Sequence, residues 1–315
     1  MASTVEGQAL TEAQRVAQIR VGAQVIAQLR LLWPMLDVGN LDATAPGWLT
    51  AATTVLQQQF RLSAATASTY LEEFRAAETG LQRLAAIDFP PLPDAAPTSL
   101  MVTGPVQIKR LIGAGVAPAA AKAAVFAEVA RTAQLHVLNG GRGALQSGIR
   151  SDRRALGYQR VTDGKPCYFC AMLASRGPVY SKRSFVNSRV HRGDGCTLEP
   201  VYDRDTEWSG RARQFAALWE AATEGKTGSA AIAAFRAQFN AVEGHTHAPR
   251  GGRVRSAPAV DLNATLVDEA KRLQREAQAA FKRGDDAERL RLQAEASAIW
   301  RRVYNEAGAG LDAAA

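Results

Sequence analysis

Apolar residues recur at helical spacing along the first quarter of the chain. Over residues 8–33 they fall three or four positions apart, which predicts an amphipathic helix that Pro34 ends. A second helical region is expected from about Pro46 to Thr79, with a break near residues 62–63. The apolar members of the two segments are Val16, Ile19, Ala23, Ile26, Leu29, Leu32, Trp33, Phe60, Tyr70, Leu71 and Phe74.

Prolines and glycines then interrupt the helical pattern. Four prolines between Leu84 and Pro97 predict an extended connector, because proline lacks the N–H group that a helix interior needs. Helix is expected again after Gly104, with a pause at residues 113–118, and to continue to about Asn139. The pair Gly140–Gly141 is typical of a helix C-cap and predicts its end there.

The pattern changes after Leu156. Residues 157–161 predict a short strand, and Asp163-Gly164 predicts a turn. The segment up to Tyr202 is rich in Gly, Pro and Cys and lacks helical periodicity, whereas helices are expected again over 209–223 and 229–242.

The C-terminal part is expected to form two amphipathic helices around Gly284–Asp285. Their apolar stripe consists of Leu262, Leu266, Ala270, Leu273, Leu290, Leu292 and Trp300.

These expectations describe a mainly α fold with a small α+β zinc-knot module. The predicted organisation is an N-terminal helical docking region (1–97), a central module (98–243) with the knot at 157–202, a linker (244–260), C-terminal amphipathic helices (261–306) and a disordered tail (307–315).

Composition favours a helical fold and reveals an uneven distribution of charge. Ala and Gln are plentiful and runs of β-branched residues are short, which favours helix. The formal charge is +8, and residues 131–192 hold twelve Lys or Arg against two Asp. Such a basic segment indicates a polyanionic partner, nucleic acid first, or else a solvated basic face. The candidate phosphate contacts are Arg142, Arg150, Arg153, Arg154, Arg160, Lys182 and Arg183.

No secretory signal is expected in residues 1–20, which are polar and alanine-rich. The most apolar early stretch, residues 21–35, is too short and too polar to span a bilayer, so no membrane partner is expected.

The chemistry of the chain is concentrated in its three cysteines and one of its four histidines. Cys167 and Cys170 are separated by two residues, and His191 and Cys196 follow with four residues between them. A Cys-x2-Cys turn presents two thiolates to one point, and a second pair can complete a tetrahedron. Zinc in a structural role prefers such a closed Cys3His shell, so the four residues predict a structural zinc site.

Two alternatives remain for the same residues. The thiols can be buried or joined as a Cys167–Cys170 or Cys170–Cys196 disulfide, with His191 on the surface. Alternatively, Cys170 and His191 can form a nucleophile–base pair. An odd number of cysteines within thirty residues favours the metal site in a reducing compartment.

The same segment resembles a known protein family. The residues that carry the resemblance are Arg131, Asn139, Asp163, Cys167, Cys170, His191 and Cys196, in the runs 131–139, 147–149 and 157–173. A helix bearing Arg and Asn, a strand ending in Asp-x3-Cys-x2-Cys, and a loop with His and Cys resemble the phage Mu F-like minor head proteins. The Tyr-Phe between the cysteines is similar to the version in tailed phages of actinobacteria. The resemblance covers about residues 125–202 and departs from the family in its closing loop, which has one cysteine.

The resemblance implies a minor head protein found in the virion or procapsid and made in the bacterial cytoplasm. Its partners would be the portal or the major capsid protein, with double-stranded DNA contacted through phosphates. Residues 8–78 would dock through Ile19, Ile26, Leu29, Trp33 and Phe60, although these can equally form the core of an N-terminal bundle.

Two other functions stay open. Relatives of this kind are often called capsid maturation proteases, and Ser147, Ser175, Ser184 and Ser188 lie near His136 or His191 in the sequence. No Gly-x-Ser-x-Gly motif accompanies them, so no catalytic residue is assigned. The third function is a DNA-binding or ejected effector protein that uses the basic segment.

Overall fold

The computed structural model describes residues 2–81, 91–187, 194–203, 205 and 208–244, together with part of 269–299. The chain divides into two compact units, Met1–His247 and Ala248–Ala315. None of the helices in the described residues is long and apolar enough to cross a membrane.

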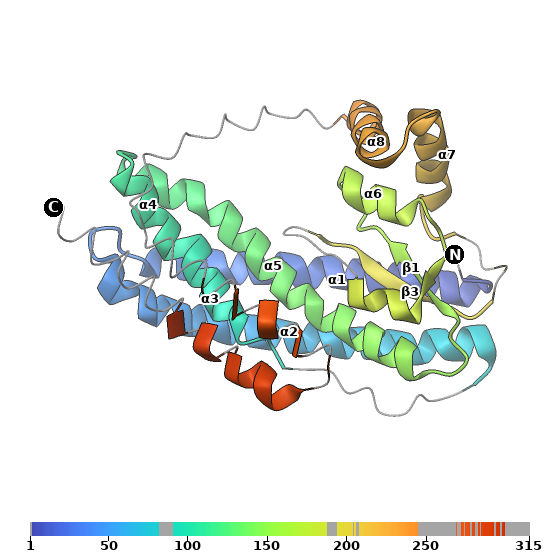
Figure 1. Ribbon diagram of the computed structural model, residues 1–315, viewed down its shortest axis with the longest axis horizontal. Coiled ribbons are helices and arrows are strands. Elements are labelled where there is room, and N and C mark those ends of the chain that lie inside the picture. The colour runs from blue at the N-terminus through green and yellow to red at the C-terminus, as the bar shows by residue number, and fades with distance from the viewer. Residues whose placement is uncertain are drawn as a thin grey trace. The chain divides into compact units, whose positions relative to one another are not determined.

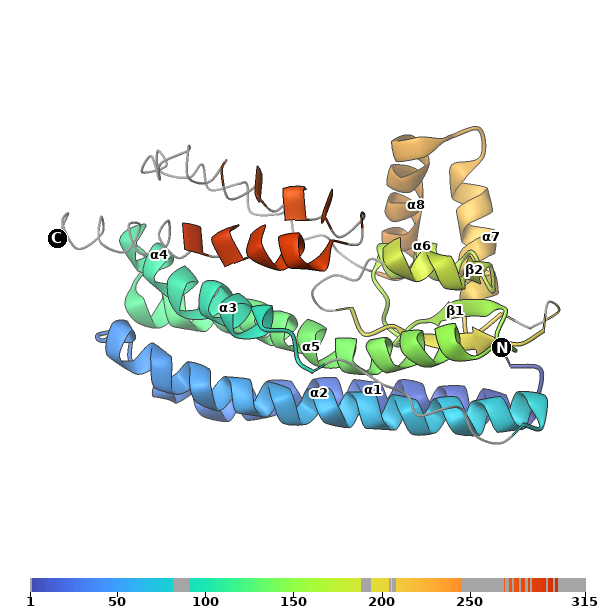
Figure 2. The same ribbon diagram turned by 60° about the horizontal axis from the view of Figure 1, so that its bottom comes forward.

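Three long helices form the body of the first unit: α1 (Val5–Leu32), α2 (Leu41–Thr79) and α5 (Pro118–Ser151). They lie side by side in Figures 1 and 2. The Thr4 side chain caps α1 by accepting a hydrogen bond from the Gly7 N–H (2.9 Å), and Gly80 ends α2 in the left-handed conformation (φ 69°). The predicted first helix is confirmed, including its end before the short turn η1 (Trp33–Met35).

The predicted break at residues 62–63 is wrong, because α2 continues through them. Ser63 is buried against the other two long helices. Its hydroxyl donates to Gln18 Oε1 of α1 (2.7 Å) and accepts from the Gly141 N–H of α5 (3.0 Å). A polar residue in this helix therefore joins three helices.

The predicted helix end at Gly140–Gly141 is also wrong, because α5 continues to Ser151. The glycines serve close packing: a Cβ at Gly140 would lie 3.2 Å from the carbonyl carbon of Phe60 and still closer to its oxygen. The absence of a side chain lets α5 approach the backbone of α2.

Replacing Gly140 by alanine is therefore expected to destabilise the protein by about 2–3 kcal/mol, since the Cβ meets backbone that cannot move aside. Gly143→Ala is the matched control on the same helix, where a Cβ would meet nothing within 4 Å. The control should be neutral or stabilising by up to about 1 kcal/mol through its helix propensity. Denaturant unfolding measures both, and equal effects of the two substitutions would contradict the packing role.

A shorter helical segment covers the bundle. It comprises α3 (Ala95–Met101), the π-helical turn η2 (Val102–Val106) and α4 (Gln107–Gly113). The extended connector predicted for 84–97 is therefore wrong at its end, where Pro97 lies in the first turn of α3 and needs no N–H partner. Residues 82–90 lie outside the described residues.

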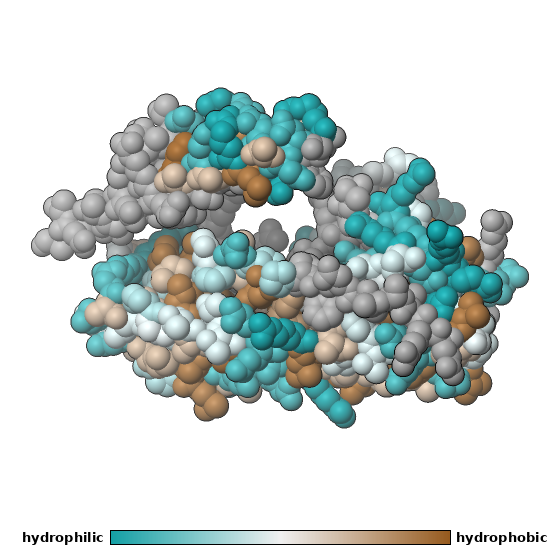
Figure 3. Space-filling model, turned by 90° about the horizontal axis from the view of Figure 1, so that it is seen from below, coloured by the Kyte–Doolittle hydropathy of each residue, from teal (hydrophilic) through white to brown (hydrophobic). Residues whose placement is uncertain are grey.

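The main core joins all of these helices. It is formed by buried residues of α1, η1, α2, α3, α4 and α5, including Leu29, Trp33, Trp48, Leu100 and Val129. The regions predicted as 1–97 and 98–243 thus share one core. Leu29, Trp33 and Phe60 are buried within their own unit, which agrees with the alternative that they form a bundle core, whereas Ile19 is 37% exposed. On the face shown in Figure 3, apolar residues of the described part are scattered among polar ones.

A three-stranded antiparallel sheet lies beside the bundle, at the end away from α4 (Figure 1). Its order is β2 (Tyr180–Ser181), β1 (Gly157–Val161) and β3 (Thr197–Val201), with Tyr158 opposite Pro200 and Arg160 opposite Leu198. The predicted strand 157–161 is confirmed. Both longer strands are buried along their length.

Glu199 lies in the middle of β3 and is completely buried. Its Oε1 accepts a hydrogen bond from Gln159 of β1, and burial raises the pKa of its carboxyl group above the usual value. The folded state therefore binds this proton more tightly than the unfolded state. Its contribution favours folding most at acidic pH and is lost as the pH rises through the raised pKa.

The variant Glu199→Gln keeps the hydrogen bond from Gln159 but removes the charge. At neutral pH it is expected to be more stable than wild type by about 1–3 kcal/mol, the cost of a poorly paired buried polar group. Its stability should also depend less on pH. Thermal unfolding between pH 4 and 8 measures this, with exposed Glu72→Gln as the control. A variant less stable than wild type at pH 7 would contradict it.

Helix α6 (Tyr168–Ala174), which follows β1, packs with the last two helices of the first unit, α7 (Ala212–Thr223) and α8 (Gly228–Val242). They share a small core around Met172, Phe215, Phe235 and Phe239, and Figure 2 shows them together beside the sheet. The helices predicted over 209–223 and 229–242 are confirmed, within a few residues. A 3-10 helix, η3 (Lys182–Asn187), follows β2.

In the second unit the described residues between 269 and 299 are helical on both sides of Asp285. Leu273, Ala277, Ala280, Leu292 and Ala296 form its core. Leu290, predicted on the apolar stripe, is 57% exposed, so that assignment is wrong. The linker 244–260 apart from Gly244, the tail 307–315, Leu262, Leu266, Ala270 and Trp300 lie outside the residues with described side chains.

Candidate metal centre

Two short elements bring the cysteines together. Cys167 is the N-cap of α6, with extended backbone after Pro166, and Cys170 lies in the first turn of that helix. Cys196 immediately precedes β3, which pairs with β1. The sheet therefore places the second cysteine loop beside the Cys-x2-Cys turn, although 25 residues separate Cys170 from Cys196 in the sequence.

The thiols of Cys170 and Cys196 lie within 4.8 Å of each other and of a carboxylate oxygen of Asp194, and all three residues are buried. The Cys167 thiol, half-buried, is hydrogen-bonded to that of Cys170. No disulfide joins the three cysteines, all of which lie in the described residues. The structure thus brings together three of the four predicted ligands, while His191 lies outside the described residues.

The electrostatics of the cluster favour a cation. Hydrogen bonds with Cys167 and Cys196, followed by burial, raise the pKa of the Cys170 thiol far above its usual value. Without a cation the Cys170 thiol retains its proton, which a metal ion must displace on binding.

Asp194 is the member of this cluster that the sequence analysis missed. Its side chain is fully buried, and its Oδ1 accepts hydrogen bonds from the Cys196 N–H (2.9 Å) and from Arg142 (3.2 Å). Within the described part of the chain its Oδ2 has no hydrogen-bond partner. The signal in the sequence was an acidic residue between two glycines, two positions before Cys196.

Arg142 of α5 holds the second cysteine loop in place. Its Nε donates to the Cys196 carbonyl (3.0 Å), one Nη donates to Asn139 Oδ1 (3.0 Å), and the other donates to the backbone and side chain of Asp194. Arg142 is only 6% exposed. Its prediction as a phosphate contact is therefore wrong, and the same holds for Arg160, which is 5% exposed.

Asp163 supports the loop from the other side. A Cβ on Gly195 would lie 2.9 Å from the Asp163 Cβ, so only glycine allows this approach. The Asp163 carboxylate accepts from the Lys165 N–H (3.1 Å), and its carbonyl accepts from Arg15 of α1 (2.8 Å). Burial, then the nearby Asp194 and Cys167, raise the pKa of Asp163.

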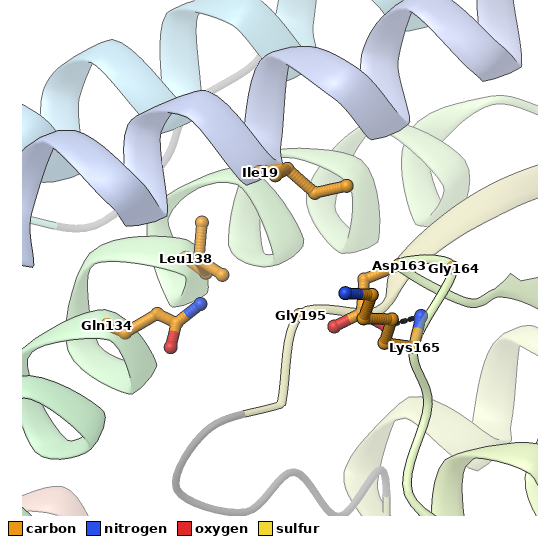
Figure 4. Close-up of a pocket in the computed structure, with 7 residues that line it drawn as sticks. All are labelled: Ile19, Gln134, Leu138, Asp163, Gly164, Lys165 and Gly195. Atoms are coloured by element: carbon orange, nitrogen blue, oxygen red, sulfur yellow. Dashed lines mark hydrogen bonds between the residues drawn. The ribbon is translucent and has the colours of Figure 1, made fainter. Parts of the chain in front are cut away.

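A cavity of about 460 Å³ borders this loop. Figure 4 shows its walls, with one side from α1 and α5 and the other from the turn after β1 and the cysteine loop. Its lining residues are Ile19, Gln134, Leu138, Asp163, Gly164, Lys165 and Gly195.

The donor set fits a zinc ion. Ligand atoms on one tetrahedral zinc lie about 3.5–3.8 Å apart. The ligand atoms of Cys170, Cys196 and Asp194 lie within 4.8 Å of one another, so these three need little movement to bind it, and Cys167 is next to them through its hydrogen bond to Cys170. Thiolates together with a nitrogen or carboxylate ligand are a set that zinc accepts. A buried carboxylate oxygen without a partner is the kind of atom that a metal ion satisfies.

A protein-family model described as VG15 protein matches residues 3–222. The chain belongs to the VG15 family. VG15 is a viral family, so this is a viral protein. The search of curated proteins found no match, and neither did the search of solved structures.

The VG15 match includes the bundle, the sheet and the cysteine cluster.

The other predicted basic residues of this VG15 protein differ from Arg142 and Arg160 in their exposure. Arg150, Arg153, Arg154 and Arg183 are exposed, and Lys182 is half-buried. Arg131, which the resemblance paired with Asn139, forms an exposed ion pair with Glu128.

Two of the serines considered for proteolysis have backbone partners. Ser175 donates to the Met172 carbonyl and Ser184 to the Ser181 carbonyl. Burial lowers the pKa of His136. Ser188 lies outside the described residues, like His191.

Proposed function

We propose that this VG15 protein is a minor head protein of a tailed phage, which binds the portal or the inner capsid during head assembly. The observation that supports the proposal most is the convergence of the motif residues. Asn139 and Cys196 share the Arg142 side chain, and Asp163 packs against Gly195 beside the cysteine cluster. Five of the seven residues that carry the resemblance, Asn139, Asp163, Cys167, Cys170 and Cys196, thus lie in or beside one centre, whereas Arg131 is in an exposed ion pair and His191 is outside the described residues.

In this proposal the metal centre has a structural role. Zinc held by the three cysteines would join the start of α6 to the start of β3, and Arg142 connects that junction to α5. The cluster is buried, which suits a structural site better than one that must admit a substrate.

Association with heads tests the function. Procapsids and mature heads of the phage that encodes the chain are purified by density gradient and analysed by quantitative mass spectrometry. The proposal expects the chain in both kinds of particle. If the chain binds the portal, particles assembled without the portal should lack it. If it binds the inner capsid, particles whose capsid protein lacks the contact surface should lack it. A chain abundant in the lysate but absent from both particles would contradict the proposal.

A basic surface is proposed to face the packaged DNA. Arg150, Arg153 and Arg154 are exposed at the end of α5, and Lys182 donates to the Asp152 carbonyl, which places it beside them. Arg183 follows in the sequence and is exposed. Contacts to phosphates alone would give binding without sequence preference.

Neutralising Arg150, Arg153 and Arg154 to glutamine is expected to weaken binding to double-stranded DNA uniformly across sequences. It should also reduce the slope of log affinity against log salt by about 2–3, because each phosphate contact contributes about 0.9. Fluorescence anisotropy between 50 and 200 mM salt measures this.

The matched control removes three exposed arginines elsewhere on the bundle, Arg20, Arg61 and Arg110. It changes the net charge equally, so an equal loss in both triple variants would indicate attraction by net charge alone. No binding by wild type at low salt would remove DNA as a partner.

A further inference from the structure

We infer that Asp194 is a metal ligand, and that its Oδ2 completes a shell formed with the thiolates of Cys167, Cys170 and Cys196. The inference rests on the zinc centre of the proposed function and specifies its fourth ligand. Spacing in the sequence had assigned that position to His191.

The inference rests on the burial and the hydrogen bonding of the Asp194 side chain. It is 0% exposed, and its Oδ2 is buried without a hydrogen-bond partner among the described residues. A buried carboxylate oxygen in that state is unfavourable unless a cation or donor meets it. The thiols of Cys170 and Cys196, which prefer the same metal, lie within 4.8 Å of a carboxylate oxygen of Asp194.

The other atoms of Asp194 are already engaged, which fixes the direction of Oδ2. Oδ1 accepts from the Cys196 N–H (2.9 Å) and from Arg142 (3.2 Å), and the backbone carbonyl accepts from the same guanidinium. Arg142 thereby acts as a positioning residue, because it holds the carboxylate through Oδ1 and leaves Oδ2 available to a metal ion.

Charge is consistent with this shell. Three thiolates and one carboxylate carry four negative charges, of which zinc offsets two. The guanidinium of Arg142, itself 6% exposed, lies against the carboxylate and offsets another. Orienting partners of this kind are typical of metal ligands in proteins.

The test uses the full chain and zinc, with Asp194→Asn as the main variant. The asparagine carbonyl oxygen can still accept from Cys196 and Arg142, which directs its NH2 group, a poor ligand, toward the metal. His191→Ala is the matched control. Chelator competition measures zinc affinity, and X-ray absorption identifies the ligands, with sulfur expected at about 2.3 Å and oxygen at about 2.0–2.2 Å.

The inference predicts three sulfur atoms and one oxygen, without the multiple scattering of an imidazole ring. It also predicts that Asp194→Asn lowers zinc affinity by more than about 100-fold, beyond the usual effect of a residue that only orients a ligand. His191→Ala should lower it by less than about 10-fold. An imidazole signal that His191→Ala removes, with little effect of Asp194→Asn, would overturn the inference but leave the zinc centre intact. Reduced protein that binds no zinc would overturn both, while head association would still test the proposed function separately.

Discussion

Cys170→Ser is expected to abolish metal binding and to unfold the part of the chain from β1 to β3. Cys170 lies between the other two thiols and contacts both, so its loss leaves too few ligands to hold zinc. Structural zinc contributes about 10–16 kcal/mol to the folding of zinc-finger peptides at neutral pH, which is comparable to the whole stability of a domain. Hydrogen exchange followed by mass spectrometry should show loss of protection over residues 157–201.

The long helices provide an internal control in the same experiment. The α1, α2 and α5 bundle has its own core, so its central amides should remain protected in Cys170→Ser. A chelator added to reduced wild-type protein should reproduce the variant. If the variant and the chelated protein both keep full protection over 157–201, the thiols serve packing alone.

Arg142→Met is expected to destabilise the protein by about 3–5 kcal/mol, the usual cost of removing one partner from a buried ion pair. Methionine fills similar space but donates nothing to the Cys196 carbonyl or to Asp194. The loop before β3 then loses its connection to α5, and zinc affinity should fall by about 10–100-fold. Denaturant unfolding and chelator competition measure the two effects.

Arg131→Met on the same helix is the matched control. Its side chain is 55% exposed and pairs with Glu128 three residues earlier, so the change should cost less than about 1 kcal/mol. A small effect of Arg142→Met, similar to this control, would show that the loop is held by other contacts.

Local pattern was sufficient to predict several elements. The helix of α1, the strand 157–161 and the helices α7 and α8 follow from periodicity and turn residues near them in the sequence. The errors arose where contacts between residues far apart in the sequence determine the structure. Gly140 appeared to be a helix end, but its role depends on the backbone of Phe60, 80 residues away.

The candidate site shows the same division. Spacing was enough to group the cysteines, because Cys-x2-Cys is a local arrangement. Spacing could not identify Asp194, whose unpartnered oxygen becomes evident only when β3 pairs with β1. Nor could it separate Arg142 from the exposed arginines after it, since burial against the cysteine loop determines its role.

The zinc content of the purified chain tests the central claim most directly. The protein is prepared under reducing conditions without affinity resins that carry metal, and its zinc is measured by elemental mass spectrometry against protein concentration. A structural site formed by three cysteines and Asp194 predicts about one zinc per chain, retained through dialysis and removed by a strong chelator. Less than about one zinc per ten chains, in protein that remains reduced and folded, would contradict the account.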